Sequence, residues 1–285
     1  MNAINRAVTW FFDLLLTPLE SLGEEFALIV VSGVFGVLAL LAFKHISSQT
    51  RIKATKDKIK GHMIEIRIYQ NDLGLVSRAI GKVLWRNAQY VLLNFGPFVP
   101  LAIPFVFVLA QLVVRYGFEP VPIVAGDPAA VMAGQGTTLE VEFARKDAAG
   151  ELTITWPAGL VPVSALVRVP QQGVAFQEFV AQSAGAYDIT LAVDGEDVVK
   201  RFHVGADGRE RLMQPERGRG ILHALLWPAE DTFGGGSAFA RVAYVYPESD
   251  LGGLPFSGPF GVLLNFFVAS FLIGALAIKP LGVQI

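Results

Sequence analysis

The 285-residue sequence lacks cysteine altogether and has few histidines and few charged residues, the latter amounting to 17%. Without cysteine it can form no disulfide, thiolate metal site or cysteine nucleophile. The four histidines, His45, His62, His203 and His223, show no metal-ligand spacing, so we expect neither a metal nor a cofactor. No phosphate-binding glycine pattern, nucleophile motif or specific nucleic-acid motif is present. We therefore expect a protein that is not an enzyme.

Apolar residues are abundant instead, at 53% of the chain, and they gather in three long runs. A helix needs roughly 20 apolar residues to cross about 30 Å of hydrocarbon. The runs at 26–43, 88–114 and 259–278 meet this requirement. We expect three transmembrane helices, over residues 26–43, 88–115 and 258–279, in contact with the lipid bilayer.

The second of these runs contains Pro97, Pro100 and Pro104. Each proline removes a backbone donor and interferes with the preceding turn of a helix. We expect a kink there, with the released carbonyls bonded to side chains or water.

Residues 1–25 contain the amphipathic stretch WFFDLLLTPLESL. Asp13 interrupts its apolar part and Arg6 is the single early cation, which is unlike a removable signal peptide. We expect a retained helix lying in the membrane interface, with Trp10 at headgroup depth.

The segment at 44–87 carries ten cations against three acids. Besides Lys44, its cations are Arg51, Lys53, Lys56, Lys58, Lys60, Arg67, Arg78, Lys82 and Arg86. The positive-inside rule places this segment in the cytoplasm. The N-terminus and residues 116–257 are then extracytoplasmic, and the tail at 280–285 is cytoplasmic. We expect the inner or plasma membrane of a prokaryote.

Helical spacing of apolar residues within 44–87 predicts two amphipathic helices. The expected stripes are Ile52, Ile59, Met63 and Ile66, and then Val76, Ile80 and Val83. Residues 70–74 have turn chemistry, with Gly74 able to adopt positive φ. We expect an antiparallel, coiled-coil-like helical hairpin. The alternative is a solvated helix beside the membrane whose cations meet anionic lipid.

Residues 116–257 change to short β-favouring segments with apolar alternation. These segments are TTLEVEFA, ELTITW, SALVRV, VAFQEFV, YDITLAV, VVKRFHV and, after residue 206, ARVAYVY. Their number and spacing predict an immunoglobulin-like sandwich, and Tyr187 after Gly185 resembles a tyrosine corner. Residues 221–227 either enter the outer interface, with Trp227 as an anchor, or pack under the sandwich.

Among the polar residues within the predicted spans, the candidates for a functional role are Ser32, Asn94, Gln111 and Asn265. A polar side chain in hydrocarbon needs a partner or a wet cavity. They either line a shared hydrophilic groove or hydrogen-bond between helices. Ser32 and Gly36 also form a small pair that lets another helix approach closely.

The order of these parts resembles the YidC family of membrane protein insertases, which includes mitochondrial oxidase-assembly insertases and three-helix archaeal relatives. SSQTRIKATKDKIKGHMIEIRIYQND is similar to the first hairpin arm of that family, and GPFVPLAIPFVFVLAQL to its second core span. The resemblance covers about residues 8–115, and 259–278 would be the remaining core helix. Bacterial members usually place an arginine in the first core span, and residues 26–43 contain none.

The resemblance implies an insertase or chaperone without covalent chemistry. In the family, an amphiphilic groove receives a hydrophobic client segment, and the hairpin helps to capture the client or the ribosome. Ser32, Asn94, Gln111 and Asn265 would then line the groove. The alternative is an accessory subunit of a membrane complex that binds its partner through the β domain. A transporter component is a third possibility, disfavoured by the lack of acids and bases within the apolar runs 26–43, 88–114 and 259–278.

Overall fold

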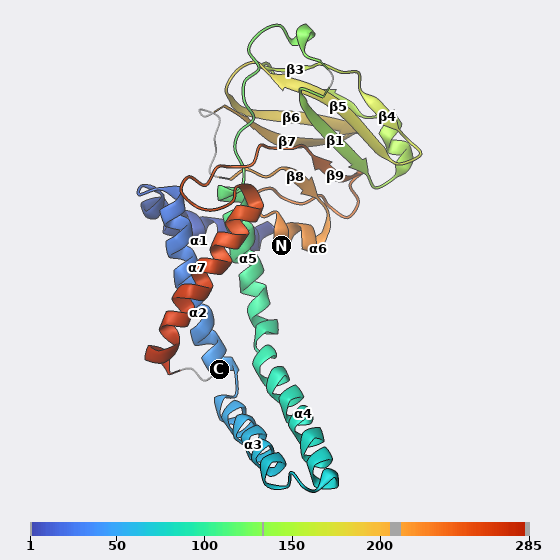
Figure 1. Cartoon of the computed structure of the whole chain (residues 1–285). Coiled ribbons are helices and arrows are strands. Elements are labelled where there is room, and N and C mark those ends of the chain that lie inside the picture. Colours follow the sequence, from blue (N-terminus) through green and yellow to red (C-terminus); the bar gives the residue numbers. More distant parts are fainter. Residues whose placement is uncertain (1, 133, 206–211, 283–285) are drawn as a thin grey trace. The chain divides into compact units, whose positions relative to one another are not determined.

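The computed structural model describes residues 2–132, 134–205 and 212–282 (Figure 1). Residues 206–211 of the predicted β domain and 283–285 of the predicted tail lie outside this described part. Three helical segments are long and apolar enough to span a membrane: Glu24–Ile46, Leu73–Tyr116 and Gly258–Leu281. The chain forms two compact units, Met1–Ala27 with Val106–Asn265, and Leu28–Phe105 with Phe266–Ile285. The combination of spanning-length helices with a β-sheet region is confirmed.

The second unit is helical. It holds most of α2 (Glu24–Ile46), all of α3 (Gln49–Ile68) and α4 (Leu73–Phe95), the start of α5 (Phe98–Tyr116) and most of α7 (Gly258–Leu281). Phe35 of α2 contacts Phe105 of α5 and Phe266 of α7, with ring centroids 5.9 and 5.3 Å away. These aromatic contacts pack the three helices together within this unit.

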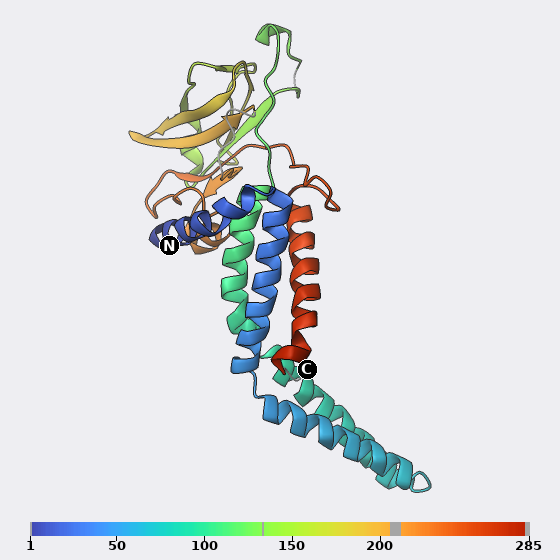
Figure 2. The same ribbon diagram turned by 90° about the vertical axis from the view of Figure 1, so that its left-hand side faces the viewer.

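The first arm and the second arm of the basic segment, α3 and α4, lie side by side as an antiparallel hairpin (Figure 2). Asp72 caps α4 by accepting hydrogen bonds from the Gly74 and Leu75 amides, at 2.9 and 3.1 Å. Gly74 does not use its ability to adopt positive φ, because the Asp72 cap draws it into the first turn of α4.

The seam between the two arms differs from the predicted stripes. It follows Ile52, Thr55, Ile59, His62 and Ile66, a three-four repeat along α3. On α4 the shielded positions are Val76, Ala79, Val83, Arg86 and Tyr90. Met63 and Ile80, expected in the seam, are 58% and 44% exposed. The small or polar residues Thr55, His62 and Ala79 lie in the seam, whereas the apolar pattern alone had placed Met63 and Ile80 there.

The hairpin arm α4 continues without interruption to Phe95, beyond the predicted boundary at residue 87. The break comes at Gly96 and Pro97, between α4 and α5. Pro100 lies in the first turn of α5, where its missing amide costs no helical bond, and Pro104 lies inside α5. The apolar run at 88–114 therefore comprises the end of one helix and nearly all of another.

The first unit contains α1 (Asn2–Glu20) and the β domain. One sheet has the order β3-β5-β1-β9-β8, with β4 also on β5, and the other has the order β2-β6-β7. The bounds of the first sheet are β1 Thr137–Phe143, β3 Leu160–Pro162, β4 Val167–Val169, β5 Val174–Ala181, β8 Glu216–Gly218 and β9 Phe239–Ala243. Those of the second are β2 Thr153–Thr155, β6 Gly185–Val193 and β7 Glu196–Val204.

The two sheets share one core. Leu139 and Phe179 from the first sheet and Leu191 and Phe202 from the second are fully buried in a single cluster. The Phe179 and Phe202 rings meet at 4.8 Å between centroids. Each predicted segment contains a strand. The three-residue strands β3 and β8 had not been predicted, because they are too short to show alternation.

The β6–β7 hairpin turns at Asp194 and Gly195, both with positive φ, at 53° and 78°. Two consecutive left-handed residues are the geometry of a type I′ turn, which matches the twist of the flanking strands. This turn sets the register that pairs Val193 with Glu196 and Gly185 with Val204. It therefore places Ile189, Leu191 and Val193 on the inner face, as their alternation predicts.

Candidate functional site

The four polar residues expected to line a groove make mostly local hydrogen bonds. The Ser32 hydroxyl donates to the Leu28 carbonyl at 2.5 Å, and the Asn94 amide donates to the Tyr90 carbonyl at 2.7 Å. The Asn265 amide donates to the Gly261 and Pro255 carbonyls, both at 2.8 Å. Such bonds satisfy a donor without help from a neighbouring span.

Gln111 behaves differently, because its side-chain amide reaches another helix and donates to the Thr9 hydroxyl of α1 at 2.8 Å. Gln111 and Asn265 belong to the first unit, and Ser32 and Asn94 to the second. A groove shared by all four therefore stays a prediction. The Asn94 carbonyl oxygen is buried and finds no hydrogen-bond partner within the described part of the chain, so this amide retains an unused acceptor.

Arg115, near the end of α5, is a deeply buried charge on a helical segment long and apolar enough to span a membrane. Its side chain is 0% exposed and its guanidinium lies 2.8 Å from the Asp13 carboxylate of α1. It also donates to the Thr9 carbonyl and to the Gln111 side chain, each at 3.3 Å. A buried guanidinium requires a nearby carboxylate and further hydrogen bonds. Together these contacts fix α1 along the last turns of α5.

Tyr116, the residue after Arg115, also connects α5 to α1. The Tyr116 hydroxyl donates to Glu20 at 2.9 Å, near the end of α1, and the Ser249 hydroxyl donates to the Tyr116 carbonyl. The loop after β9 is thereby linked to the same turn of α5. We call Thr9, Asp13, Gln111 and Arg115 the α1–α5 polar cluster.

This cluster is absent from the sequence-based predictions, in which Asp13 interrupts an apolar stretch and Arg115 ends a span. The available signal was spacing: Thr9 and Asp13 are four residues apart, as are Gln111 and Arg115, so each pair lies on one helical face. Two such pairs predict facing polar stripes once α1 and α5 are known to be neighbours.

The basic residues of the hairpin are presented to solvent. Eight of the nine named cations are exposed, and Arg86 is half-buried and donates to Gln89 at 2.7 Å. Glu65 lies 3.5 Å from Lys82 on the opposite arm. The hydrogen bond from His62 and the charge of Lys82 hold the pKa of Glu65 below its usual value. The exposed cations give the hairpin a positively charged surface.

The β domain contains a buried ion pair. Lys200 of β7 is 1% exposed and donates to Glu230, to the Gln214 carbonyl at 2.7 Å and to the Tyr244 hydroxyl at 3.1 Å. Burial lowers the pKa of Lys200 and raises that of Glu230, and their mutual attraction opposes both shifts. All three Lys200 protons are directed at acceptors, which is the arrangement of a structural pair rather than of an available base.

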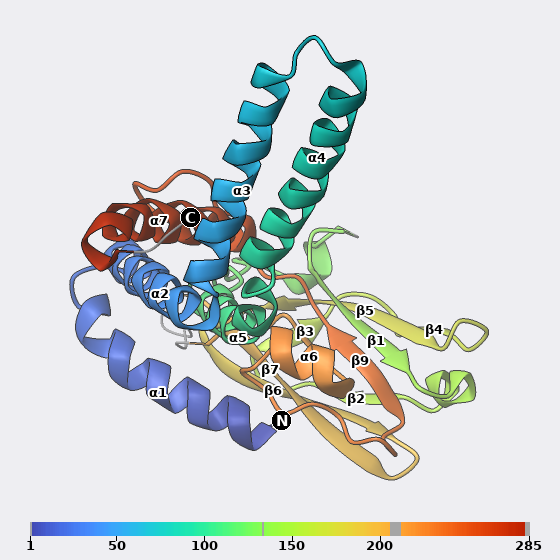
Figure 3. The same ribbon diagram turned by 90° about the horizontal axis from the view of Figure 1, so that it is seen from below.

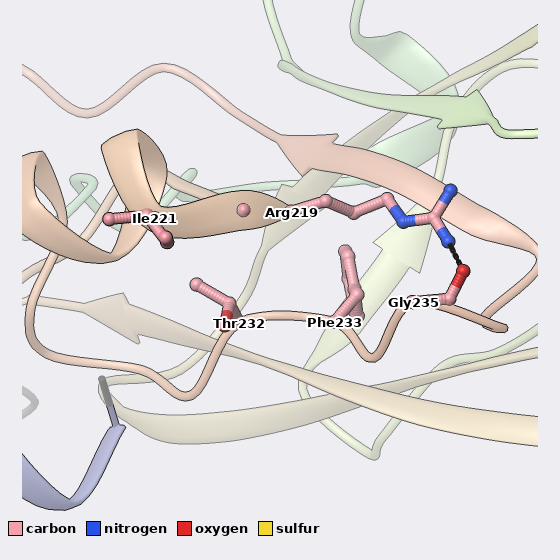
Figure 4. Close-up of a pocket in the computed structure, with 6 residues that line it drawn as sticks. Arg219, Ile221, Thr232, Phe233 and Gly235 are labelled. Carbon is pink, nitrogen blue, oxygen red and sulfur yellow. Dashed lines mark hydrogen bonds between the residues drawn. The ribbon is translucent and has the colours of Figure 1, made fainter.

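Two cavities lie in the β domain. One, of about 400 Å³, is bordered by Asp188, Arg201, Arg217 and Glu230. The other, of about 500 Å³, is lined by Arg219, Ile221, Thr232 and Phe233, and Arg219 spans it to donate to the Gly235 carbonyl (Figure 4). The first cavity is bordered by both acidic and basic side chains, and in the second the Arg219 guanidinium already donates to the Gly235 carbonyl. Neither cavity therefore presents polar groups that converge on one ligand position. Across residues 2–132, 134–205 and 212–282, no cluster of three His, Asp or Glu side chains could hold a metal ion.

No protein-family profile matches the chain, and no curated protein matches it. Function must therefore be inferred from the structural features themselves. These features are the spanning-length helices, the basic hairpin, the α1–α5 polar cluster and the two-sheet domain.

Proposed function

We propose that this chain is a YidC-like membrane protein insertase or chaperone, which assists the insertion or assembly of other membrane proteins through a groove between three helices. One observation supports it above all: the order of α1, α2, the α3–α4 hairpin, the interrupted helix α5 and α7. A chain of this kind offers a client segment a mainly apolar groove with a few polar side chains. Its function needs no covalent chemistry.

The first span contributes no charge to such a groove, because α2 has no arginine between Phe26 and Phe43. Arg115 does not replace it, since Asp13, Thr9 and Gln111 already engage its guanidinium. The proposed groove is therefore neutral. It would shorten the path of a client segment through the bilayer by offering side-chain amides as hydrogen-bond partners. The foremost of these is the Asn94 carbonyl oxygen, which has no partner in the described part of the chain.

The proposed orientation places the hairpin in the cytoplasm and the β domain outside it. The exposed cations of α3 and α4 support this, because segments rich in lysine and arginine are retained on the cytoplasmic side. A cytoplasmic hairpin can reach ribosomes as well as the anionic inner leaflet. The extracytoplasmic side would be the periplasm or the exterior of a prokaryotic cell.

Orientation is open to a direct test, because the chain has no cysteine that would give background labelling. Lys58→Cys on α3 and Val167→Cys on β4 introduce one exposed thiol each. With a membrane-impermeant maleimide on intact cells, we expect labelling of Val167→Cys alone, and of Lys58→Cys after permeabilisation. Labelling of both in intact cells would reject the orientation and with it a role near ribosomes.

Client capture tests the function itself. A photo-crosslinking residue at Asn94 should trap nascent membrane proteins, and one at Asn265 should do so less well because that residue is 5% exposed. Leu92, 71% exposed on the same helix as Asn94, and Leu276, 79% exposed on α7, are the matched controls. We expect client adducts from Asn94 at several times the yield from Leu92, and stranded small membrane proteins on depletion. Equal yields at both positions would contradict the groove.

The second candidate function is that of an accessory subunit which binds an extracytoplasmic partner through the β domain. The order β2-β6-β7, with β1 beside β5, supports an immunoglobulin-like arrangement for this domain. The Tyr187 hydroxyl, near the start of β6, donates to the Ser183 carbonyl at 2.9 Å, as in a tyrosine corner. Crosslinks to one stable neighbour with client insertion unaffected would favour this function.

A further inference from the structure

A short helix in the β domain, α6 (Gly220–Leu226), exposes an apolar face. Ile221 and Leu222 are 69% and 70% exposed, and Leu226 is 46% exposed. The opposite face is used within the unit: Ala224 is buried, and Trp227 packs on Phe118 with ring centroids 6.1 Å apart. Trp227 is partly buried and packs against the core of the β domain.

Helix α6 lies beside the N-terminal end of α1 (Figure 3), and a buried hydrogen bond joins the two helices. The Asn5 side-chain amide, 2% exposed, donates to the Ala224 carbonyl at 2.6 Å. That carbonyl would normally accept from residue 228, which is proline and has no amide proton. Asn2 adds a second link by accepting from the Thr232 hydroxyl at 3.2 Å. Two segments 219 residues apart in sequence are thereby held together.

The outward face of α1 is apolar as well. Ile4, Phe11, Leu14 and Leu15 are 52%, 53%, 65% and 42% exposed, and Trp10 beside them is 67% exposed. Their spacing of three, four and seven residues makes one stripe. Phe12 and Leu16, on another face, are buried against the unit. The helix therefore has separate protein-facing and outward-facing apolar sides.

Chain continuity indicates what covers this surface. Three residues, Ser21, Leu22 and Gly23, separate α1 from α2, which is long and apolar enough to span a membrane. The end of α1 must therefore lie at a boundary of the bilayer. Helices that lie in the plane of the membrane interface have an uncharged stripe of aliphatic and aromatic residues, often with a tryptophan at its margin. The outward face of α1 has this composition.

We propose that α1 and α6 form a single lipid-binding platform, in which Ile221 and Leu222 enter the same leaflet as Phe11 and Leu14. The platform attaches the β domain to the membrane at a point distant in sequence from its two flanking spans. It holds the β domain against the bilayer surface whichever of the two candidate functions is correct.

Depth-dependent quenching tests the platform. Full-length variants with one cysteine, Leu14→Cys, Ile221→Cys or Leu222→Cys, carry an NBD fluorophore and are reconstituted in vesicles of phosphatidylcholine and phosphatidylglycerol. A nitroxide on the lipid acyl chain should remove about half of the emission at all three positions, since in-plane helices bury their apolar side about 5–10 Å deep. Aqueous iodide should have little effect there.

Val167→Cys on β4 is the matched control, because it is an aliphatic residue of similar exposure, 53%, in the same unit. Iodide should quench it and the lipid nitroxide should not. Quenching of Ile221 and Leu222 by iodide would overturn the proposal, as would quenching by neither agent, which would mean that protein covers α6. Lipid quenching at Leu14 without quenching at Leu222 would also overturn it, because α1 alone would then touch the membrane.

Discussion

Replacing Asp13 with alanine is expected to lower the free energy of unfolding by about 3 kcal/mol, near the lower end for breaking a buried ion pair. The guanidinium of Arg115 is 0% exposed and would remain charged without its carboxylate. The Asp13 side chain is itself 37% exposed, which is why the loss should not reach the upper end of that range. Unfolding in mild detergent, followed by tryptophan fluorescence, measures the change.

Two further variants separate this effect from a general weakening of α1. Arg115→Met should cost less than Asp13→Ala, because it removes the buried charge instead of stranding it. Asp188→Ala breaks an ion pair with Arg201 in which the Asp188 side chain is 54% and the Arg201 side chain 51% exposed. This variant should lower the free energy of unfolding by at most about 1 kcal/mol. If Asp13→Ala costs no more than Asp188→Ala, the α1–α5 polar cluster does not hold α1 in place.

Gly36→Ala is expected to destabilise the helical unit by about 1–3 kcal/mol, the usual cost of overpacking a close contact. A Cβ at Gly36 on α2 would come within 2.8 Å of the Ser270 carbonyl carbon and 2.9 Å of its Cα on α7. These are backbone atoms, so relief requires the two helices to separate. The Gly36 carbonyl oxygen also lies 3.3 Å from the position a Cβ would take at Gly274, so the contact is tight from both sides.

Gly81→Ala on α4 is the matched control, because nothing lies within 4 Å of the added Cβ. There the substitution should stabilise by about 0.5–1 kcal/mol, since alanine has a higher helix propensity than glycine. Thermal unfolding of both variants in the same detergent gives the comparison. A neutral Gly36→Ala would mean that α2 and α7 are not in close contact.

The general plan of the chain could be predicted from the sequence because each part carries its own local signal. Apolar length alone predicted the helices α2 and α7. Alternation predicted the faces of β1 and β6, and cation density distinguished the hairpin from its surroundings. These signals depend on solvent and backbone geometry, which act within a segment regardless of its neighbours.

Boundaries were less predictable. Residue 87 was expected to separate the hairpin from the second span, and the structure has one helix, α4, running through this position to Phe95. Hydropathy changes gradually along the chain, whereas a helix stops where Gly96 and Pro97 interrupt its hydrogen bonds. The seam of the hairpin was shifted for a similar reason: Thr55 and His62 fill positions that composition alone does not identify as shielded.

The sequence by itself determined that this protein has three stretches suited to lipid, a basic helical segment and a strand-rich domain. Only the tertiary structure decided which polar groups meet: Asp13 with Arg115, Asn5 with the Ala224 carbonyl, and Lys200 with Glu230. The physical reason is that burial of apolar surface depends on amount and periodicity, which a segment carries with it. A buried hydrogen bond or ion pair depends on a partner distant in the chain, and its position is set only when the elements pack.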